Sequence, residues 1–142
     1  MCIMIYNEEN LRKCIATIEN RFDEQCHSQC QICSAIPENP YRLDVDNSDD
    51  PPSPSWVSEI DQLQRVLGLE ARSFSINQCP DCGQCYGYSS IYTYYMGCSE
   101  TEYTLVKLKK GEGLAWMQER LSYYVLPTSI RQTNLGFEIS YA

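Results

Sequence analysis

The short motif Cys79-Pro80-Asp81-Cys82-Gly83 constrains this chain more than any other feature of its sequence. Two cysteines separated by two residues can place both thiolates on one tight turn. Pro80 fixes one backbone dihedral, and Gly83 can take the left-handed conformation that lets both sulfurs converge on one ion. The motif therefore predicts a metal-binding turn, which needs a second pair of ligands from elsewhere in the chain.

Cys30 and Cys33 have the same spacing and lie far upstream, in a polar segment that we interpret as a second metal loop. Four thiolates from two such pairs form a closed tetrahedral site, which leaves no coordination position for a substrate. We therefore predict a structural zinc site. Its predicted ligands are Cys30, Cys33, Cys79 and Cys82.

Cys26 and Cys85 are the alternative ligands, because each lies within a few residues of a predicted pair. His27 is the only histidine in the chain. We interpret it as a solvated loop residue and not as a ligand, because four sulfurs already complete a zinc site. Which of these three residues replaces a predicted ligand, if any, stays open at this point.

Iron–sulfur chemistry is the first rival interpretation. Cys79, Cys82 and Cys85 match three cysteines of a bacterial cluster loop, but the Cys-Pro pair that completes that pattern does not follow. The three cysteines of residues 26–33 resemble the C-x3-C-x2-C spacing of radical-SAM enzymes, which need a longer barrel than this chain can build. A zinc site is the simpler interpretation of both segments.

Dithiol redox chemistry at Cys79 and Cys82 is the second rival. Such a site needs its cysteines at the start of a helix, whose dipole lowers the thiol pKa. The residues after Cys82 are rich in glycine and tyrosine and favour a strand instead.

The cysteine count agrees with metal binding. The chain has 9 cysteines, an odd number that argues against a fully paired set of disulfides. The first residues lack a basic segment and have only a short apolar run, and no stretch is long enough for a membrane helix. We therefore expect a cytoplasmic protein, whose thiols stay reduced.

The formal net charge of −8 bears on partners. Only residues 104–142 are mildly basic, with 5 basic and 3 acidic side chains. Because neutralisation of phosphates dominates nucleic-acid affinity, we expect neither DNA nor RNA as a partner. A basic protein suits this charge better, and an immunity or antitoxin-like role is one concrete form of such a partnership.

Hydrophobic periodicity predicts three helices. Asn7 can cap a helix over 8–23, whose apolar face includes Cys14 as a small core residue. Ser53 or Ser55 can cap a second helix over 54–67, and a third is expected over 114–124. Residues 37–54 are acidic and rich in proline, and we interpret them as a surface loop.

The remaining segments predict strands. A short edge strand is expected at 2–6, and strands over 70–78 and 86–95 form a hairpin around the metal turn. One tyrosine-rich face of the strand 86–95 is expected in the core, with surplus tyrosines exposed as a protein-contact patch. A turn at 97–102, a strand at 103–109 and a last strand at 137–141 complete the prediction.

The segment Cys79–Gly83 resembles the metal-binding turn, or knuckle, of zinc-ribbon and rubredoxin-type proteins. The longer stretch from Cys79 through Tyr92, Gly97 and Ser99 to Leu108 is similar to small uncharacterised bacterial proteins in which CPxCG precedes a tyrosine-rich strand. Cys98, inserted between Gly97 and Ser99, departs from that pattern. The resemblance implies a metal site and no particular activity.

Together these features predict one α+β domain over residues 1–142. We expect a small antiparallel sheet that carries a zinc-ribbon-like knuckle and packs against about three helices. The predicted role is that of a non-enzymatic, zinc-stabilised protein that binds or regulates another protein. An iron–sulfur or dithiol redox protein is the alternative.

Overall fold

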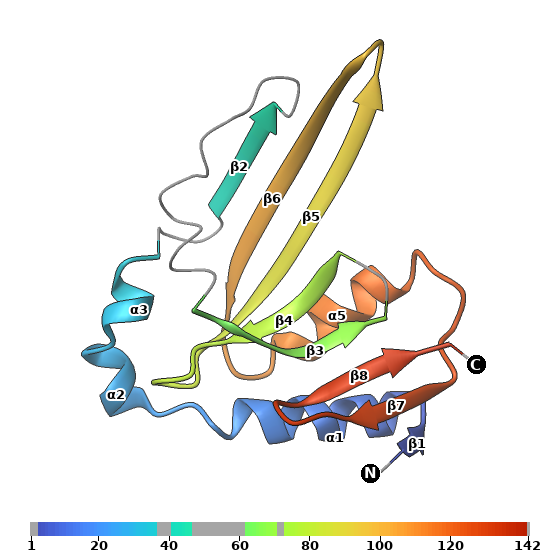
Figure 1. Cartoon of the computed structure of the whole chain (residues 1–142). Coiled ribbons are helices and arrows are strands. Elements are labelled where there is room, and N and C mark those ends of the chain that lie inside the picture. The colour runs from blue at the N-terminus through green and yellow to red at the C-terminus, as the bar shows by residue number, and fades with distance from the viewer. Residues whose placement is uncertain (1–2, 37–40, 47–61, 71–72, 142) are drawn as a thin grey trace.

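The structure, a computed structural model, describes residues 3–36, 41–46, 62–70 and 73–141. Within them a mixed, mostly antiparallel sheet is flanked by helices (Figure 1). The helices are α1 (Glu8–Glu19), α2 (Glu24–Ser28), α3 (Gln31–Ser34) and α5 (Gly113–Leu121). The strands are β1 (Ile3–Ile5), β2 (Tyr41–Asp46), β3 (Gln64–Leu69), β4 (Phe74–Gln78), β5 (Cys85–Tyr95), β6 (Cys98–Leu108), β7 (Ser129–Gln132) and β8 (Phe137–Ser140).

The strands lie in the order β1-β7-β8-β3-β4-β5-β6-β2. All neighbours are antiparallel except β3 and β8, which run parallel with Leu67 opposite Phe137. The prediction of an α+β fold is confirmed at this level. The prediction of a purely antiparallel sheet is wrong, because β8 pairs antiparallel with β7 on one side and parallel with β3 on the other.

Helix α1 begins where the sequence predicts. The Asn7 side chain accepts a hydrogen bond from the Asn10 backbone N–H at 2.7 Å, which satisfies one of the unpaired donors of the first turn. Leu11, Cys14 and Ile18 are buried on its inner face. The helix is shorter than predicted: it ends at Glu19, and Phe22 lies beyond it with 41% of its surface exposed.

The helix predicted over 54–67 is wrong where the structure can test it. Residues 64–69 form strand β3, and residues 54–61 lie outside the described part of the chain. Val66, Leu67 and Leu69 are all buried, so both faces of this central strand are covered. A strand covered on both faces shows a continuous apolar run, which periodicity cannot separate from a buried helix.

Two predicted loops contain strands. Within the loop predicted over 37–54, residues 41–46 form β2 and pair antiparallel with β6, while 37–40 and 47–54 lie outside the described residues. Of the turn predicted over 97–102, only Gly97 belongs to a turn in the structure, and the rest is strand. Met96 and Gly97 have positive φ angles of 48° and 80°, and β6 already begins at Cys98.

The sheet has a buried cluster on each face. Helices α1 and α5 contact each other and cover one face, with Leu67, Ile76 and Trp116 in the cluster between them and the sheet. A smaller cluster forms near α2 and α3. It contains Cys30, Leu63, Cys79, Cys82, Tyr86 and Leu105. Successive residues of a strand point to opposite faces, so Tyr86 faces the smaller cluster and Gly87 faces Trp116.

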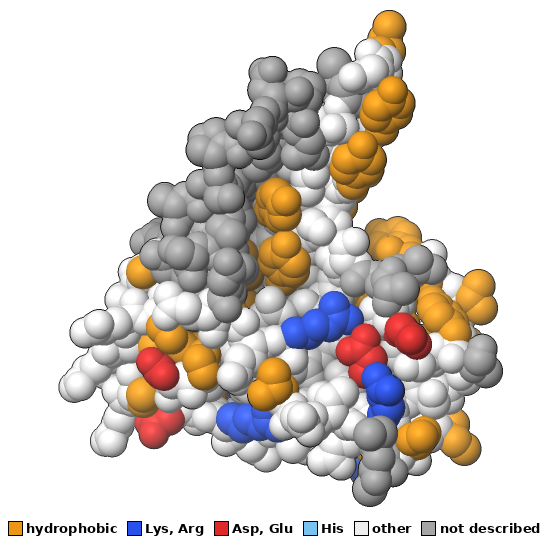
Figure 2. Space-filling view, in the orientation of Figure 1, with side chains coloured by type: hydrophobic (Ala, Val, Ile, Leu, Met, Phe, Trp, Pro, Cys, Tyr) orange, Lys and Arg blue, Asp and Glu red, His pale blue; other side chains and the backbone are white. Residues whose placement is uncertain are grey.

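Strands β5 and β6 extend well beyond β3 and β4 as a long hairpin, and β2 lies beside β6 (Figure 1). Its buried root includes Tyr86, which is 3% exposed, whereas Tyr92 and Tyr94 further along are 63% and 66% exposed. The predicted core face of this strand is therefore confirmed only at the root. The outer half presents its tyrosines to solvent (Figure 2).

Candidate metal centre

The knuckle connects β4 to β5, as the sequence predicts. The Gly83 backbone N–H donates to the Cys79 carbonyl at 3.0 Å, and the Cys79 N–H donates to the Gln84 carbonyl at 2.9 Å. Gly83 has φ of +82°, and a Cβ at this position would collide with the backbone of Arg21. Glycine is therefore required twice, by the left-handed backbone and by the close approach of a second segment.

The other cysteine pair belongs to α3 and its N-cap, and α2 and α3 both lie beside the knuckle (Figure 1). The Asp23 side chain caps α2 by accepting from the Cys26 N–H, and the Asp23 N–H donates to the Cys82 carbonyl at 2.8 Å. These bonds hold the start of the short helices against the knuckle. Cys30 is then the N-cap residue of α3, and Cys33 lies one turn further on.

The structure brings together the four cysteines that the sequence singled out. The sulfurs of Cys30, Cys33, Cys79 and Cys82 all lie within 4.8 Å of one another. The Cys30 and Cys79 sulfurs are 3.6 Å apart, and the Cys33 and Cys82 sulfurs are 3.5 Å apart, so neither pair is a disulfide. In a tetrahedral zinc–thiolate site with bonds of about 2.3 Å, neighbouring sulfurs lie about 3.8 Å apart. The four sulfurs therefore fit a single metal ion.

The thiols influence one another strongly. Burial raises the pKa of Cys82 to about 12, although hydrogen bonds from the Gln84 backbone and Cys33 act in the opposite direction. Burial also raises the pKa of Cys33. Burial acts to raise the pKa of Cys30 too, but hydrogen bonds from the Cys33 backbone and neighbouring thiols outweigh it and lower the pKa. A bound cation would favour the thiolate forms of Cys33 and Cys82, against the effect of burial.

His27 lies against the cluster without belonging to it. Its Nδ1 is 3.3 Å from the Cys82 sulfur, and its Nε2 is 3.0 Å from Nζ of Lys107 on β6. Burial and the Lys107 charge lower the pKa of His27. The prediction of a solvated loop residue is therefore wrong, because the imidazole is half-buried between a sulfur and an ammonium group.

Two buried amides, which the sequence does not single out, hold the root of the knuckle. The Gln78 side chain donates to the carbonyls of Ile18 and Gly83 at 2.8 and 3.0 Å. The Gln84 side chain donates to the carbonyls of Cys85 and Leu108, both at 2.8 Å. Glutamine has no local signal of burial, so only the tertiary arrangement shows that these side chains connect the knuckle to α1 and β6.

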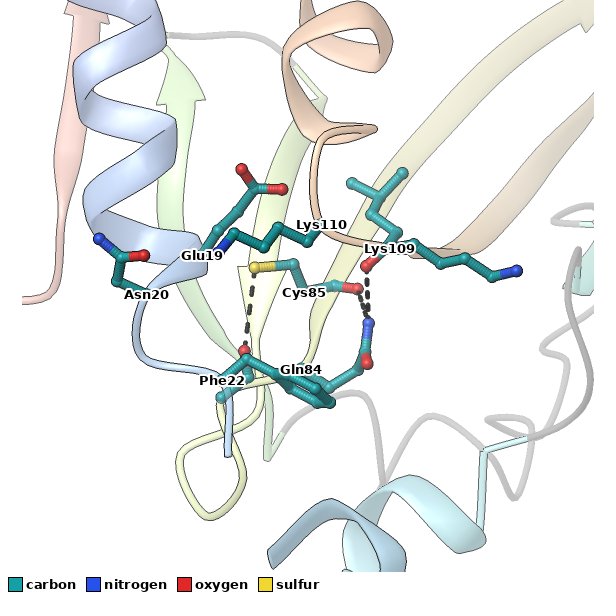
Figure 3. Close-up of a pocket in the computed structure, with 9 residues that line it drawn as sticks. Glu19, Asn20, Phe22, Gln84, Cys85, Lys109 and Lys110 are labelled. Atoms are coloured by element: carbon teal, nitrogen blue, oxygen red, sulfur yellow. Dashed lines mark hydrogen bonds between the residues drawn. The ribbon is translucent and has the colours of Figure 1, made fainter. Parts of the chain in front are cut away.

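Cys85 does not join the four sulfurs, for a reason that strand geometry supplies. It begins β5 on the same side as Gly87, so its thiol points toward the α1 and α5 side of the sheet. There it lines a small cavity of about 280 Å³ with Glu19, Phe22 and Lys110 (Figure 3). Burial raises the pKa of Cys85 to about 12. An iron–sulfur loop that uses Cys79, Cys82 and Cys85 together is therefore not supported.

Cys26 also lies outside the cluster. Its sulfur donates to the Asp81 carbonyl at 3.3 Å, at the outer side of the knuckle. Neither alternative ligand is thus placed with the predicted four. Cys79 and Cys82 precede a strand and not a helix, so no helix dipole activates them for dithiol exchange.

Comparison with known proteins finds no matching family model, no matching curated protein and no matching solved structure. Among the described residues, no helix is long and apolar enough to span a membrane. The four-cysteine cluster is therefore the feature from which a function has to be argued.

Proposed function

We propose that Cys30, Cys33, Cys79 and Cys82 bind one zinc ion in a closed structural site. The observation that carries the proposal is the approach of all four sulfurs to within 4.8 Å of one another, from two segments far apart in the sequence. Four protein thiolates fill the coordination of zinc and leave no open position for a substrate. The site is therefore structural, and the protein is not an enzyme through this centre.

The spacing of the sulfurs favours a single ion over a cluster. The thiolates of an iron–sulfur cluster bind separate iron atoms, which hold the sulfurs well apart. Contacts of 3.5 and 3.6 Å between sulfurs leave room for one ion only. Zinc is our choice among single ions, because a buried tetrahedral tetrathiolate is its usual structural site.

The ion would connect the short helices to the root of the long hairpin. Three of the six buried members of the smaller cluster are the cysteines Cys30, Cys79 and Cys82. Without an ion, this cluster loses its strongest contacts, because thiols alone contribute little packing area. We infer that zinc fixes residues 24–34 against the hairpin root.

We propose that the outer half of the hairpin binds another protein. Tyr92, Tyr94 and Met96 are exposed at 63%, 66% and 97%, and tyrosine and methionine are enriched at protein interfaces. The paired strand places Glu100 opposite Thr93 and Glu102 opposite Ile91. The whole chain has a net charge of −8, and a surface with two glutamates on it suits a basic partner. An immunity or antitoxin-like protein would have such a partner.

Metal analysis of the purified protein tests the first proposal. We expect a colourless protein with one zinc per chain, and Cys33→Ser should reduce the bound zinc. Cys26→Ser is the matched control and should leave the zinc content unchanged, since Cys26 is outside the cluster. A brown protein that contains iron and absorbs at about 400 nm would contradict the proposal and indicate an iron–sulfur cluster.

Binding measurements with a partner purified from the native host test the second proposal. The double change Tyr92→Ser and Tyr94→Ser should abolish the complex, whereas Tyr123→Ser, at a residue 78% exposed after α5, should not. Added salt should weaken the complex, because opposite charges are screened. Equal loss with Tyr123→Ser, or cross-links that map away from the hairpin, would contradict it.

A further inference from the structure

His27 lies between the metal centre and the hairpin. Its ring nitrogens contact the Cys82 sulfur at 3.3 Å and the Lys107 Nζ at 3.0 Å. It comes from α2, whereas Cys82 belongs to the knuckle and Lys107 to β6. One imidazole on α2 thus connects two other segments of the chain, the knuckle and β6.

The two contacts assign the ring proton. A lysine ammonium group has three hydrogen-bond donors and no acceptor. The Nε2 atom of His27 must therefore accept the hydrogen bond from Lys107 and carries no proton. A neutral imidazole then has its proton on Nδ1, which faces the Cys82 sulfur. The Cys82 sulfur is therefore the acceptor of this bond.

Lys107 pairs directly across the hairpin with Tyr86. Directly opposed residues in an antiparallel pair share one face of the sheet. The Tyr86 hydroxyl is hydrogen bonded to Cys33, another of the four cysteines. A single pair at the hairpin root therefore supports two of the four sulfurs, one directly and the other through His27.

We propose that His27, oriented by Lys107, is a positioning residue of the metal centre that donates its Nδ1–H to the Cys82 thiolate. This inference rests on the proposed metal site. Four thiolates around a divalent ion carry a net negative charge. A donated N–H withdraws charge from one sulfur, and the nearby ammonium group of Lys107 offsets part of the remaining charge. The bond also keeps α2 attached to the hairpin root as long as the ion is bound.

A difference in reactivity between the sulfurs follows. Cys82 is 1% exposed and hydrogen bonded to His27, so its sulfur is shielded and less nucleophilic. Cys33 is only partly buried, and its surroundings include a shallow hollow that His27, Cys30 and Lys107 also line. Alkylating reagents should therefore modify Cys33 before Cys82 in the metal-bound protein.

The test uses the full chain loaded with zinc or cobalt(II) and a set of matched variants. His27→Phe removes the donor and keeps a ring beside Phe22, whereas His27→Asn places an amide N–H close to the position of Nδ1. We expect His27→Phe to weaken zinc binding about 10-fold in competition with a chelator and His27→Asn to restore most of the affinity. The sulfur-to-cobalt charge-transfer band should shift to lower energy in His27→Phe only.

Lys107→Met should change affinity in the same direction as His27→Phe. Lys109→Met removes the same charge from a neighbouring exposed lysine and should change nothing. If the unaltered protein binds the metal and His27→Phe has the same affinity and the same spectrum, this inference is overturned and the metal site still holds. Failure of the unaltered protein to bind zinc or cobalt would instead overturn the metal site itself.

Discussion

Gly83 is the residue on which the knuckle most depends. Its φ of +82° favours glycine, and any side chain would meet the Arg21 backbone. We predict that Gly83→Ala destabilises the protein by at least about 1–2 kcal/mol, the cost of a left-handed alanine, and also weakens metal binding. Chemical denaturation with and without a chelator measures both effects. An unchanged midpoint in both conditions would show that the turn is not held as described.

Cys14 shows the opposite behaviour to a ligand. Burial raises the pKa of its thiol to about 11, so the thiol is neutral and inaccessible at neutral pH. Because the pKa of Cys14 is higher in the folded than in the unfolded protein, the neutral thiol contributes to the stability of the fold. This contribution is complete below the pKa of an unfolded cysteine, about 8.5, and is lost as pH rises through about 11. We predict that alkylation of Cys14, followed by mass spectrometry, requires unfolding. Modification as fast as that of Cys26 in the native protein would contradict this.

Sequence reasoning at the scale of residues succeeds where spacing is the signal. Two cysteines with two residues between them, followed by glycine, predict the knuckle and its left-handed Gly83. The same reasoning misjudges His27, because its contacts with Cys82 and Lys107 bring together residues that are 55 and 80 positions away. It does not separate Cys85 from the other cysteines either, since the face of β5 on which Cys85 lies depends on where the strand begins.

At the scale of elements, the long hairpin and the central strand β3 differ in what the sequence reveals. The alternating tyrosines predict β5, because aromatic residues at period two are typical of strands. They do not predict that the pairing with β4 ends at Ser89, beyond which Ile91 and Tyr92 are exposed. Strand β3 is missed because its buried run Val66–Leu69 lacks alternation.

Gly87 tests how β5 packs against α5. The Trp116 indole lies where a side chain at Gly87 would be, so even a methyl group must displace the ring. We predict that Gly87→Ala costs about 1–3 kcal/mol through overpacking and changes the near-ultraviolet circular dichroism of tryptophan. Ser90→Ala, on the same strand and half-buried, is the control and should leave both unchanged. Identical spectra for all three proteins would contradict the packing.

At the scale of the whole molecule, the two faces of the sheet differ in what holds them. The face under α1 and α5 has a large aliphatic cluster, whereas the face under α2 and α3 depends on the four cysteines. A metal should therefore stabilise one side of the protein only. The sequence predicts this dependence in outline, since it has two cysteine pairs in segments with few other apolar residues.

Removal of the metal should expose this difference. We predict that a chelator accelerates amide hydrogen exchange over residues 24–34 and the knuckle, while α1 and β8 keep their protection. Hydrogen exchange followed by mass spectrometry measures each segment separately. Uniform acceleration over the chain, or no change at residues 24–34, would show that the ion does not act locally on these helices.

The central claim is that one ion is bound by the sulfurs of Cys30, Cys33, Cys79 and Cys82 and by nothing else. X-ray absorption spectroscopy of the purified protein at the zinc edge tests it most directly. The account predicts a single shell of four sulfur atoms at about 2.3 Å. A shell that includes nitrogen or oxygen, a neighbouring metal atom, or the absence of bound zinc would contradict it.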